Sequence, residues 1–149
     1  MRADREAAVF SEGQIEIAAP PGSVWDLLAD IERWPAWNPD VTSVSVEGEI
    51  VEGTVFRWKA GPGTITSVLR LVDRPHALSW TGRTFGIDAI HAWRFEQRGA
   101  STIASMEESF DGLPARLFRR RLQRRLDATT RAGLEKLKEV AERRASHGG

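Results

Sequence analysis

Apolar residues alternate with polar ones through the middle of the chain and recur every three or four residues near its two ends. Alternation with a period of two is typical of half-buried strands, and a period of 3.6 is typical of amphipathic helices. The alternation predicts a first strand at about 9–18, with Ile15 and Ile17 on one face. It predicts six further strands at about 42–49, 54–60, 64–72, 76–81, 86–97 and 100–110.

A short amphipathic helix is predicted after the first strand. Its apolar residues follow the i, i+3, i+4, i+7 spacing of one helical face: Val24, Leu27, Leu28 and Ile31. Ser23 and Asp26 have the spacing of a capping box, and Pro21 also suits the first helical turn. Proline lacks an N–H and restricts the residue before it. Pro35 and Pro39 therefore predict a break in the chain and a second short helical turn.

The last two strands form a predicted hairpin that turns at Arg98-Gly99. This register places His91 opposite Met106 and diagonal to Glu108, with both polar side chains on the otherwise apolar inner face. Trp93 shares this inner face of the hairpin, and the same alternation sends a larger set of residues inward on the other strands: Phe56, Trp58, Ile65, Ser67, Leu69, Leu71, Leu78 and Trp80. One face of the sheet is therefore expected to be rich in tryptophan.

A long helix is predicted from about 114 to 144. Its buried face is expected to contain Phe118, Leu122, Leu126, Thr129, Thr130, Gly133, Leu137 and Val140. A glycine inside a helix costs about 1 kcal/mol relative to alanine, so Gly133 is expected either to leave space for a cavity beside the helix or to let its backbone pack tightly against the sheet. Residues 145–149 are expected to form a frayed tail.

Composition narrows the class of protein. A chain of 149 residues is the length of one domain, which we assign to 1–149. Lys+Arg and Asp+Glu both number 21, so no global field favours DNA or an anionic membrane. There is no cysteine, and no apolar run approaches the about 18 residues that cross a bilayer. We expect a cytoplasmic protein without disulfides or membrane insertion.

The chemistry available is sparse. No phosphate-binding, dinucleotide-binding or hydrolase motif is present, and His76, His91 and His147 are too scattered to suggest a metal site or a cofactor. His91 and Glu108 are the candidates for acid–base work, because a carboxylate can hold an imidazole in one tautomer or keep it charged. The same pair can also satisfy its own hydrogen bonds in an apolar interior, and this structural interpretation is favoured.

Several stretches together resemble a known superfamily. They are IEIAAPPGSVWDLLADIERWPAWNPDV, EGEIVEGTVFRWK, HAWRFEQ and SMEESFDG, followed by the long helix. The chain resembles the START-like (SRPBCC) superfamily, in particular its polyketide cyclase/dehydrase branch. The resemblance implies an α+β helix-grip fold: a seven-stranded curved antiparallel sheet around a long C-terminal helix, with two short helices after strand 1. It also implies a deep apolar cavity between the sheet and that helix.

The resemblance implies binding or carriage of a hydrophobic small molecule that is polyketide-, lipid- or aromatic-ring-like. The candidate ligand-binding residues are Trp37, Phe56, Trp58, Ser67, Leu69, Trp80, Trp93, Met106, Leu126, Thr130 and Gly133. The alternative is a cyclase, aromatase or dehydratase that uses His91 and Glu108, with Ser67 or Arg83 polarising an oxygen. The few polar groups inside favour binding over catalysis.

A weaker alternative rests on the arginine-rich stretch at 116–125, where six arginines stand within ten residues. Such a surface suits an acidic protein partner or RNA. A solvated helix face is the more usual explanation of such a run. A homodimer is left open.

Overall fold

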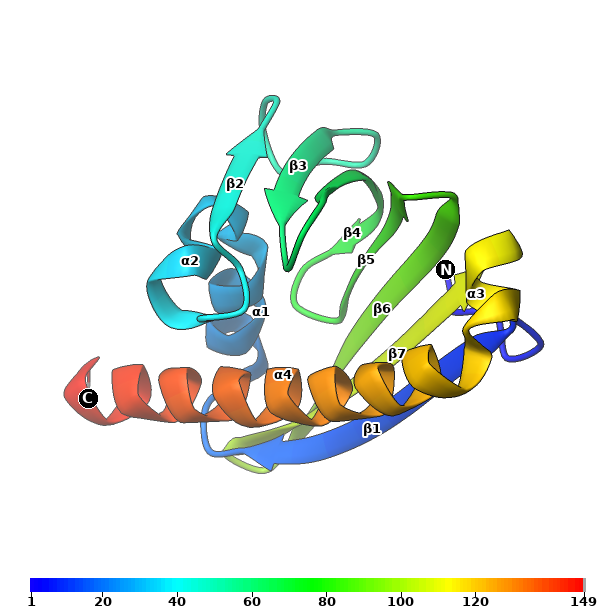
Figure 1. The fold of residues 1–149 in the computed structure, drawn as a ribbon. Helices are drawn as coiled ribbons and strands as arrows, with labels where there is room; N and C mark the ends of the chain where they lie inside the picture. Colours follow the sequence, from blue (N-terminus) through cyan, green and yellow to red (C-terminus); the bar gives the residue numbers. More distant parts are fainter. Residues whose placement is uncertain (149) are drawn as a thin grey trace.

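The computed structural model describes residues 1–148 as a seven-stranded antiparallel sheet that curves around one long helix (Figure 1). The elements are β1 Val9–Ile17, α1 Pro21–Ala29, a 3-10 turn Ile31–Arg33, α2 Trp34–Trp37, β2 Ser43–Val46, β3 Val55–Lys59, β4 Thr64–Asp73, β5 Ala77–Thr84, β6 Ile87–Arg98, β7 Ser101–Asp111, α3 Leu113–Leu117 and α4 Arg119–Gly148. The strand order is β1-β7-β6-β5-β4-β3-β2. The predicted helix-grip architecture is confirmed.

Helix α1 begins at a proline and not at a capping box. Pro20 is the N-cap residue, Pro21 occupies the first turn, and no side chain caps the helix. The capping box predicted from Ser23 and Asp26 is therefore wrong. Asp26 turns outward and accepts hydrogen bonds from Arg74, at 2.7 Å from Nε to Oδ1 and 2.9 Å from Nη2 to Oδ2.

The proline-rich segment after α1 breaks as predicted into a 3-10 turn and the short helix α2. Trp34 is buried, and its Nε1 donates to the carbonyl oxygen of Leu28 at 2.8 Å. The N–H of Asn38 closes α2 on the carbonyl of Trp34, and the side chain of Asn38 accepts from the N–H of Asp40 at 3.0 Å. The segment thereby folds back over one end of the sheet (Figure 1).

The β6–β7 hairpin turns one residue later than predicted. Gly99 adopts φ 59°, a left-handed conformation that suits glycine in a two-residue turn, and Arg98 pairs with Ser101. The register consequently moves by two residues, so His91 lies directly opposite Glu108 and not diagonal to it. A shift of two leaves each side chain on its predicted face.

A bulge interrupts β4 between Leu69 and Leu71. An extra residue in one strand reverses the alternation beyond it. Leu69 keeps its predicted inward position opposite Trp80, but Leu71 pairs with Ser79 on the outer face, and Val72 packs inward opposite Leu78. The prediction that Leu71 faces inward is therefore wrong.

The C-terminal helix is interrupted at Phe118. This residue has φ −112° and ψ 31°, which separates the short helix α3 from α4. Its side chain is exposed, so the prediction that Phe118 belongs to the buried face is wrong, and Thr129 is exposed as well. Leu126, Thr130, Leu137 and Val140 are buried as expected. Helix α4 extends to Gly148 and includes most of the tail that we expected to fray; Gly149 lies outside the described residues.

The core divides into two clusters of unequal size. The larger one joins α1, the inner face of the sheet and the C-terminal half of α4, and it includes Trp34, Phe56 and Leu137. The smaller one contains three fully buried residues: Val9, Ala115 and Leu126. It lies under the N-terminal half of α4, beside α3.

Candidate ligand-binding site

A buried histidine–glutamate pair lies on the inner face of the sheet. Nδ1 of His91 on β6 is 2.8 Å from Oε1 of Glu108 on β7. Their side chains are only 9% and 8% exposed. Both residues point inward because each occupies an inner position of the strand alternation, and the register sets them face to face.

The geometry of this pair defines what it can do. At this distance a proton on Nδ1 can pair with the carboxylate, an arrangement that orients the imidazole and leaves Nε2 for another partner. Ser11 on β1 pairs directly with Glu108 and is also buried. Ser11 is not among the predicted site residues, because the register of β1 against β7 is a long-range pairing that strand periodicity does not specify.

Two tryptophans enclose the imidazole of His91. The ring of Trp80 stacks on it, with centroids 5.1 Å apart and an interplanar angle of 16°. Trp58 approaches edge-on at 6.1 Å, and its Nε1 donates to Oγ of Ser67 at 3.0 Å. Five consecutive strands of the sheet, β3 to β7, thus bring together five of the predicted residues: Trp58, Ser67, Trp80, His91 and Glu108.

Trp34 extends this aromatic cluster from the helical segment. Its ring lies 5.7 Å from Phe56, 5.6 Å from Trp58 and 5.3 Å from Trp80, centroid to centroid. The contacts with Phe56 and Trp58 are edge-to-face, an arrangement that the ring quadrupoles favour, and the contact with Trp80 is tilted at 44°. Trp37, and not Trp34, is among the residues predicted to bind the ligand. The position of Trp34 between an amphipathic helix and Pro35 was the available signal that it packs against the sheet.

Some buried polar atoms in this region have no hydrogen-bond partner in the described protein. They are Nε1 of Trp80, Oγ1 of Thr130 on α4 and Nε1 of the half-buried Trp37. Buried polar groups are nearly always satisfied, by protein, water or a ligand. These atoms are therefore candidates to contact a bound molecule.

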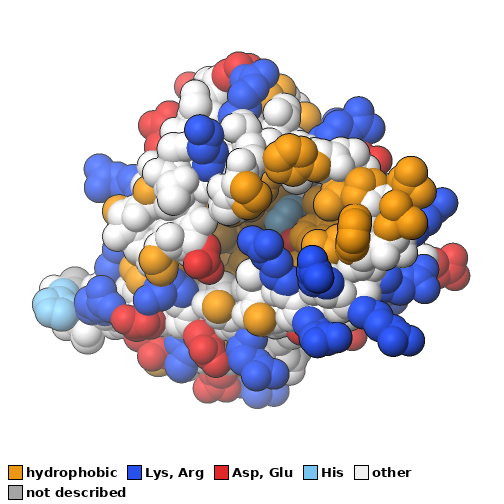
Figure 2. Space-filling model, in the orientation of Figure 1, with side chains coloured by type: hydrophobic (Ala, Val, Ile, Leu, Met, Phe, Trp, Pro, Cys, Tyr) orange, Lys and Arg blue, Asp and Glu red, His pale blue; other side chains and the backbone are white. Residues whose placement is uncertain are grey.

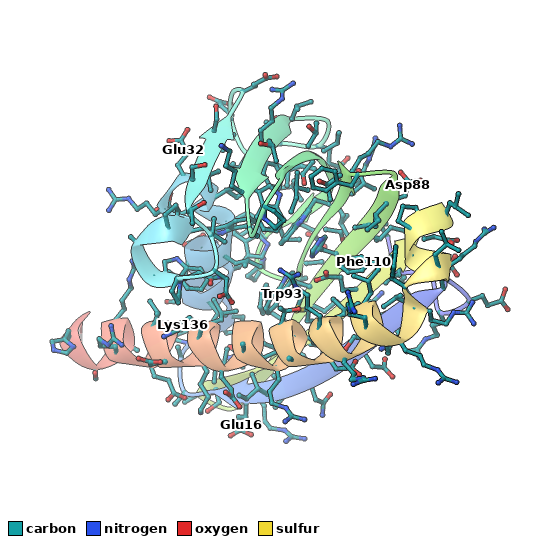
Figure 3. All side chains as sticks on the ribbon, in the orientation of Figure 1. Glu16, Glu32, Asp88, Trp93, Phe110 and Lys136 are labelled. Carbon is teal, nitrogen blue, oxygen red and sulfur yellow. The ribbon has the colours of Figure 1, made fainter. Side chains whose placement is uncertain are left out.

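The remaining predicted residues lie at different distances from the pair. Leu69 is buried opposite Trp80. Trp93 lies opposite Met106, stacks on Phe95 at 6.2 Å and faces the helix side of the sheet (Figure 3). Leu126 belongs instead to the small cluster beside α3. Gly133 is half-buried, and a Cβ placed there would have no atom within 4 Å, so the space expected beside it exists.

The surface is hollowed on the side where the sheet faces α4. Figure 2 shows hydrophobic side chains around this hollow and a histidine within it. A separate cavity of about 660 Å³ lies against the outer face of β1, β7 and β6. Its lining is largely polar, with Arg2, Glu12, Gln14, Arg94 and Glu107 among it. Such a lining does not suit a hydrophobic ligand, so the candidate site is the inner hollow.

The described residues contain neither a cluster of metal ligands nor a helix that could span a membrane. No three histidine, aspartate or glutamate side chains gather there as metal ligands would. None of the helices in residues 1–148 is both long and apolar enough to cross a membrane. A cytoplasmic location and a dimeric state stay predictions.

A curved antiparallel sheet that holds a long C-terminal helix above an apolar inner face defines a START-like protein. Residues 10–142 match the model of the family described as polyketide cyclase / dehydrase and lipid transport. The chain belongs to this family, as its sequence motifs predicted.

Solved structures agree with this fold. A hypothetical protein from Helicobacter pylori superposes with a TM-score of 0.81 at 16% identity, covering 92% of this chain and 90% of that one. The di-domain ARO/CYC StfQ from the steffimycin biosynthetic pathway superposes with a TM-score of 0.79 at 18% identity, and the match covers 93% of this chain and 52% of that one. A START superfamily protein from Mycobacterium smegmatis superposes with a TM-score of 0.71 at 14% identity, and the match covers 94% of this chain and 99% of that one.

Proposed function

We propose that this protein binds and carries a hydrophobic, ring-containing small molecule between the inner face of the sheet and α4. The observation that supports this is a buried His91–Glu108 pair, whose imidazole stacks on Trp80 in a mainly apolar interior. Flat aromatic walls favour flat rings, because stacked rings gain dispersion and quadrupole energy beyond simple burial. The polar pair gives such a ligand one oriented end.

The ligand should carry oxygen atoms near that end. Nε1 of Trp80 can only donate, and Oγ1 of Thr130 can donate or accept. Nε2 of His91 accepts from a hydroxyl when the ring is neutral and donates to a carbonyl when it is charged. The hydroxyl and ketone oxygens spread over a polyketide-like ring system could pair with several of these groups, whereas an acyl chain has oxygen only at its carboxyl end and its methylenes pair with none. We therefore rank ring-containing polyketides above simple lipids.

Titration with a flat hydroxylated probe tests the proposal. We expect 1,8-dihydroxyanthraquinone to quench tryptophan fluorescence with saturation, and to bind more tightly than palmitate. Trp80→Phe keeps an aromatic wall but removes the indole N–H, and should weaken binding by about 1 kcal/mol. Native mass spectrometry of the purified protein would show a ligand carried along from the cell.

Trp25→Phe is the matched control. Trp25 is also buried, but its Nε1 already donates to the carbonyl of Ala77 at 2.8 Å. This substitution should lower stability and leave affinity for the probe unchanged. Equal affinities for the wild type and Trp80→Phe would remove Trp80 from the site. Absence of saturable quenching in the wild type would contradict the proposal itself.

Acid–base catalysis on a polyketide is the second candidate, favoured by the direct 2.8 Å contact of His91 with Glu108. The other groups proposed for it are less suitable. Ser67 already accepts from Trp58, and Arg83 is exposed and pairs with Asp88 at 2.9 Å. If His91→Ala and Glu108→Gln kept the affinity for a polyketide but abolished its turnover, the protein would be an enzyme and not a carrier.

A further inference from the structure

Four large apolar side chains protrude beside the arginine-rich segment. Phe85 is 71% exposed, Leu113 and Leu117 are each 68% exposed, and Phe118 is 55% exposed. We call these four residues and six neighbouring arginines the apolar–arginine patch; the arginines are Arg116, Arg119, Arg120, Arg121, Arg124 and Arg125. Figure 2 shows hydrophobic side chains gathered near the hollow, with Lys and Arg side chains next to them.

The break at Phe118 creates this patch. In a continuous helix, the spacing of Phe118 with Leu122 and Leu126 would direct Phe118 toward the sheet. The interruption turns it outward and separates α3, which exposes Leu113 and Leu117. The turn that carries Phe85 lies beside α3, since Pro114 Cγ is 3.5 Å from where a Cβ would stand on Gly86. Residues from two parts of the chain thus form one surface.

The backbone conformation and the exposure of Phe85 are both unfavourable for a phenylalanine. Its φ is 49°, in the left-handed region that large side chains rarely adopt. A glycine there would relieve the backbone, and a polar residue would suit the exposure better. One edge of its ring lies against Gly63, where a Cβ would collide with Cε2 of Phe85, and the rest of the ring stays in solvent, an arrangement that suits a residue with a role in binding.

The charge around these apolar residues is local. The whole chain has 21 basic and 21 acidic residues, yet six arginines stand within 116–125 without an acidic residue among them. Among the described residues, Arg116 is the one member of this group in an ion pair, with Asp111 at 3.4 Å. The guanidinium groups of the others are available to phosphates, which they bind in a two-pronged geometry.

We propose that the apolar–arginine patch docks on the surface of an anionic phospholipid bilayer. The four apolar side chains would enter the headgroup boundary while the arginines contact lipid phosphates, the two forces that hold proteins at membrane interfaces. RNA would use the arginines but would leave the protruding leucines unexplained. The patch also lies near the hollow, so docking would bring the mouth of the proposed site to the lipid (Figure 2).

Vesicle sedimentation tests this proposal on the whole protein without any ligand. We expect binding to vesicles of phosphatidylcholine with phosphatidylglycerol, little binding to phosphatidylcholine alone, and a steep loss as NaCl rises from about 0.05 to 0.5 M. The double variant Leu117→Ser, Phe118→Ser should partition at least about tenfold less. Arg120→Glu with Arg121→Glu should lose binding to a similar degree.

Matched controls keep net charge and exposure comparable. Arg143→Glu with Arg144→Glu changes the same charge on exposed positions at the far end of α4, and Val51→Ser removes an exposed apolar residue from the β2–β3 connection. Both should bind like the wild type. Circular dichroism checks folding, which these surface changes should preserve. Binding of polyglutamate without any vesicle binding would favour an acidic protein partner and overturn the proposal, as would equal binding to both vesicle types.

Discussion

The two halves of α4 meet the sheet differently. The C-terminal half places Leu134, Leu137 and Val140 in the large core, against α1 and the aromatic cluster. The N-terminal half contributes one apolar residue, Leu126, to a cluster of three fully buried residues. Between them lies Gly133, with open space around its missing Cβ. Helix α4 is therefore packed more extensively at its C-terminal end than at its N-terminal end.

This division explains how one domain can be stable and still contain a hollow. Unfilled apolar space costs stability in proportion to its volume, so an open interior has to be offset by tight packing elsewhere. Trp34, Phe56 and Trp80 supply that packing where α1 and α2 close the sheet. The lightly packed end carries the exposed Phe118 and the arginines.

Alanine substitutions in the two halves should show the largest difference. Leu137→Ala removes a fully buried side chain from the large core, and we expect it to lower the free energy of unfolding by about 4 kcal/mol. Leu126→Ala is chemically identical and equally buried, but its cluster is small and can collapse. We expect about 2 kcal/mol there. Urea unfolding measures both, and equal losses would contradict the comparison.

The inner face of the sheet could be predicted from the sequence more completely than the segment around Phe118. Strand alternation placed Trp58, Trp80 and His91 on the inner face, because a period of two survives small errors in strand ends. The exact pairing of His91 with Glu108 depended on whether the turn used Gly99 as its second or first residue. Local sequence allowed both, and the twist of the hairpin decided between them.

The break in the C-terminal helix at Phe118 could not be predicted from the spacing of apolar residues. The apolar spacing continues through Phe118 and Leu122, so periodicity predicts one helix. The interruption follows from how α3 packs on β6 and β7, which is tertiary information. The family resemblance implied that Trp34 packs where the short helices meet the sheet, but its particular neighbours were out of reach for a similar reason: Phe56, Trp58 and Trp80 come from distant strands, and only the folded sheet brings them together.

Two glycines at the boundary between the halves provide a sharper test. Gly133→Ala adds a methyl group where nothing lies within 4 Å, so it should gain about 1 kcal/mol of unfolding free energy from helix propensity. Gly13→Ala on β1 would place its Cβ 2.9 Å from Cδ1 of Leu134, which must move aside. We expect this variant to lose about 1 kcal/mol. A stabilised Gly13→Ala would show that the packing there is looser than described.

The smallest expected effect concerns the ion pair that fastens α1 to the turn after β4. The hydrogen bonds from Arg74 hold the pKa of Asp26 below its usual value. A carboxylate with a lowered pKa stabilises the fold above the unfolded pKa of about 3.9, and that contribution disappears as the pH falls through the folded pKa. Asp26→Asn should therefore lower stability only at neutral pH.

The size of this effect is limited by solvent, since both side chains are more than half exposed. We expect Asp26→Asn to cost about 0.5 kcal/mol at pH 7 and nothing at about pH 2, where wild type and variant both lack the charge. Asp40 forms no ion pair among the described residues, so the control substitution Asp40→Asn should leave the stability unchanged both at pH 7 and at about pH 2. Thermal unfolding of the three proteins across this pH range makes the measurement. A difference that persists in acid would mean that the hydrogen bonds to Arg74, and not the charge of Asp26, fasten α1 to the sheet.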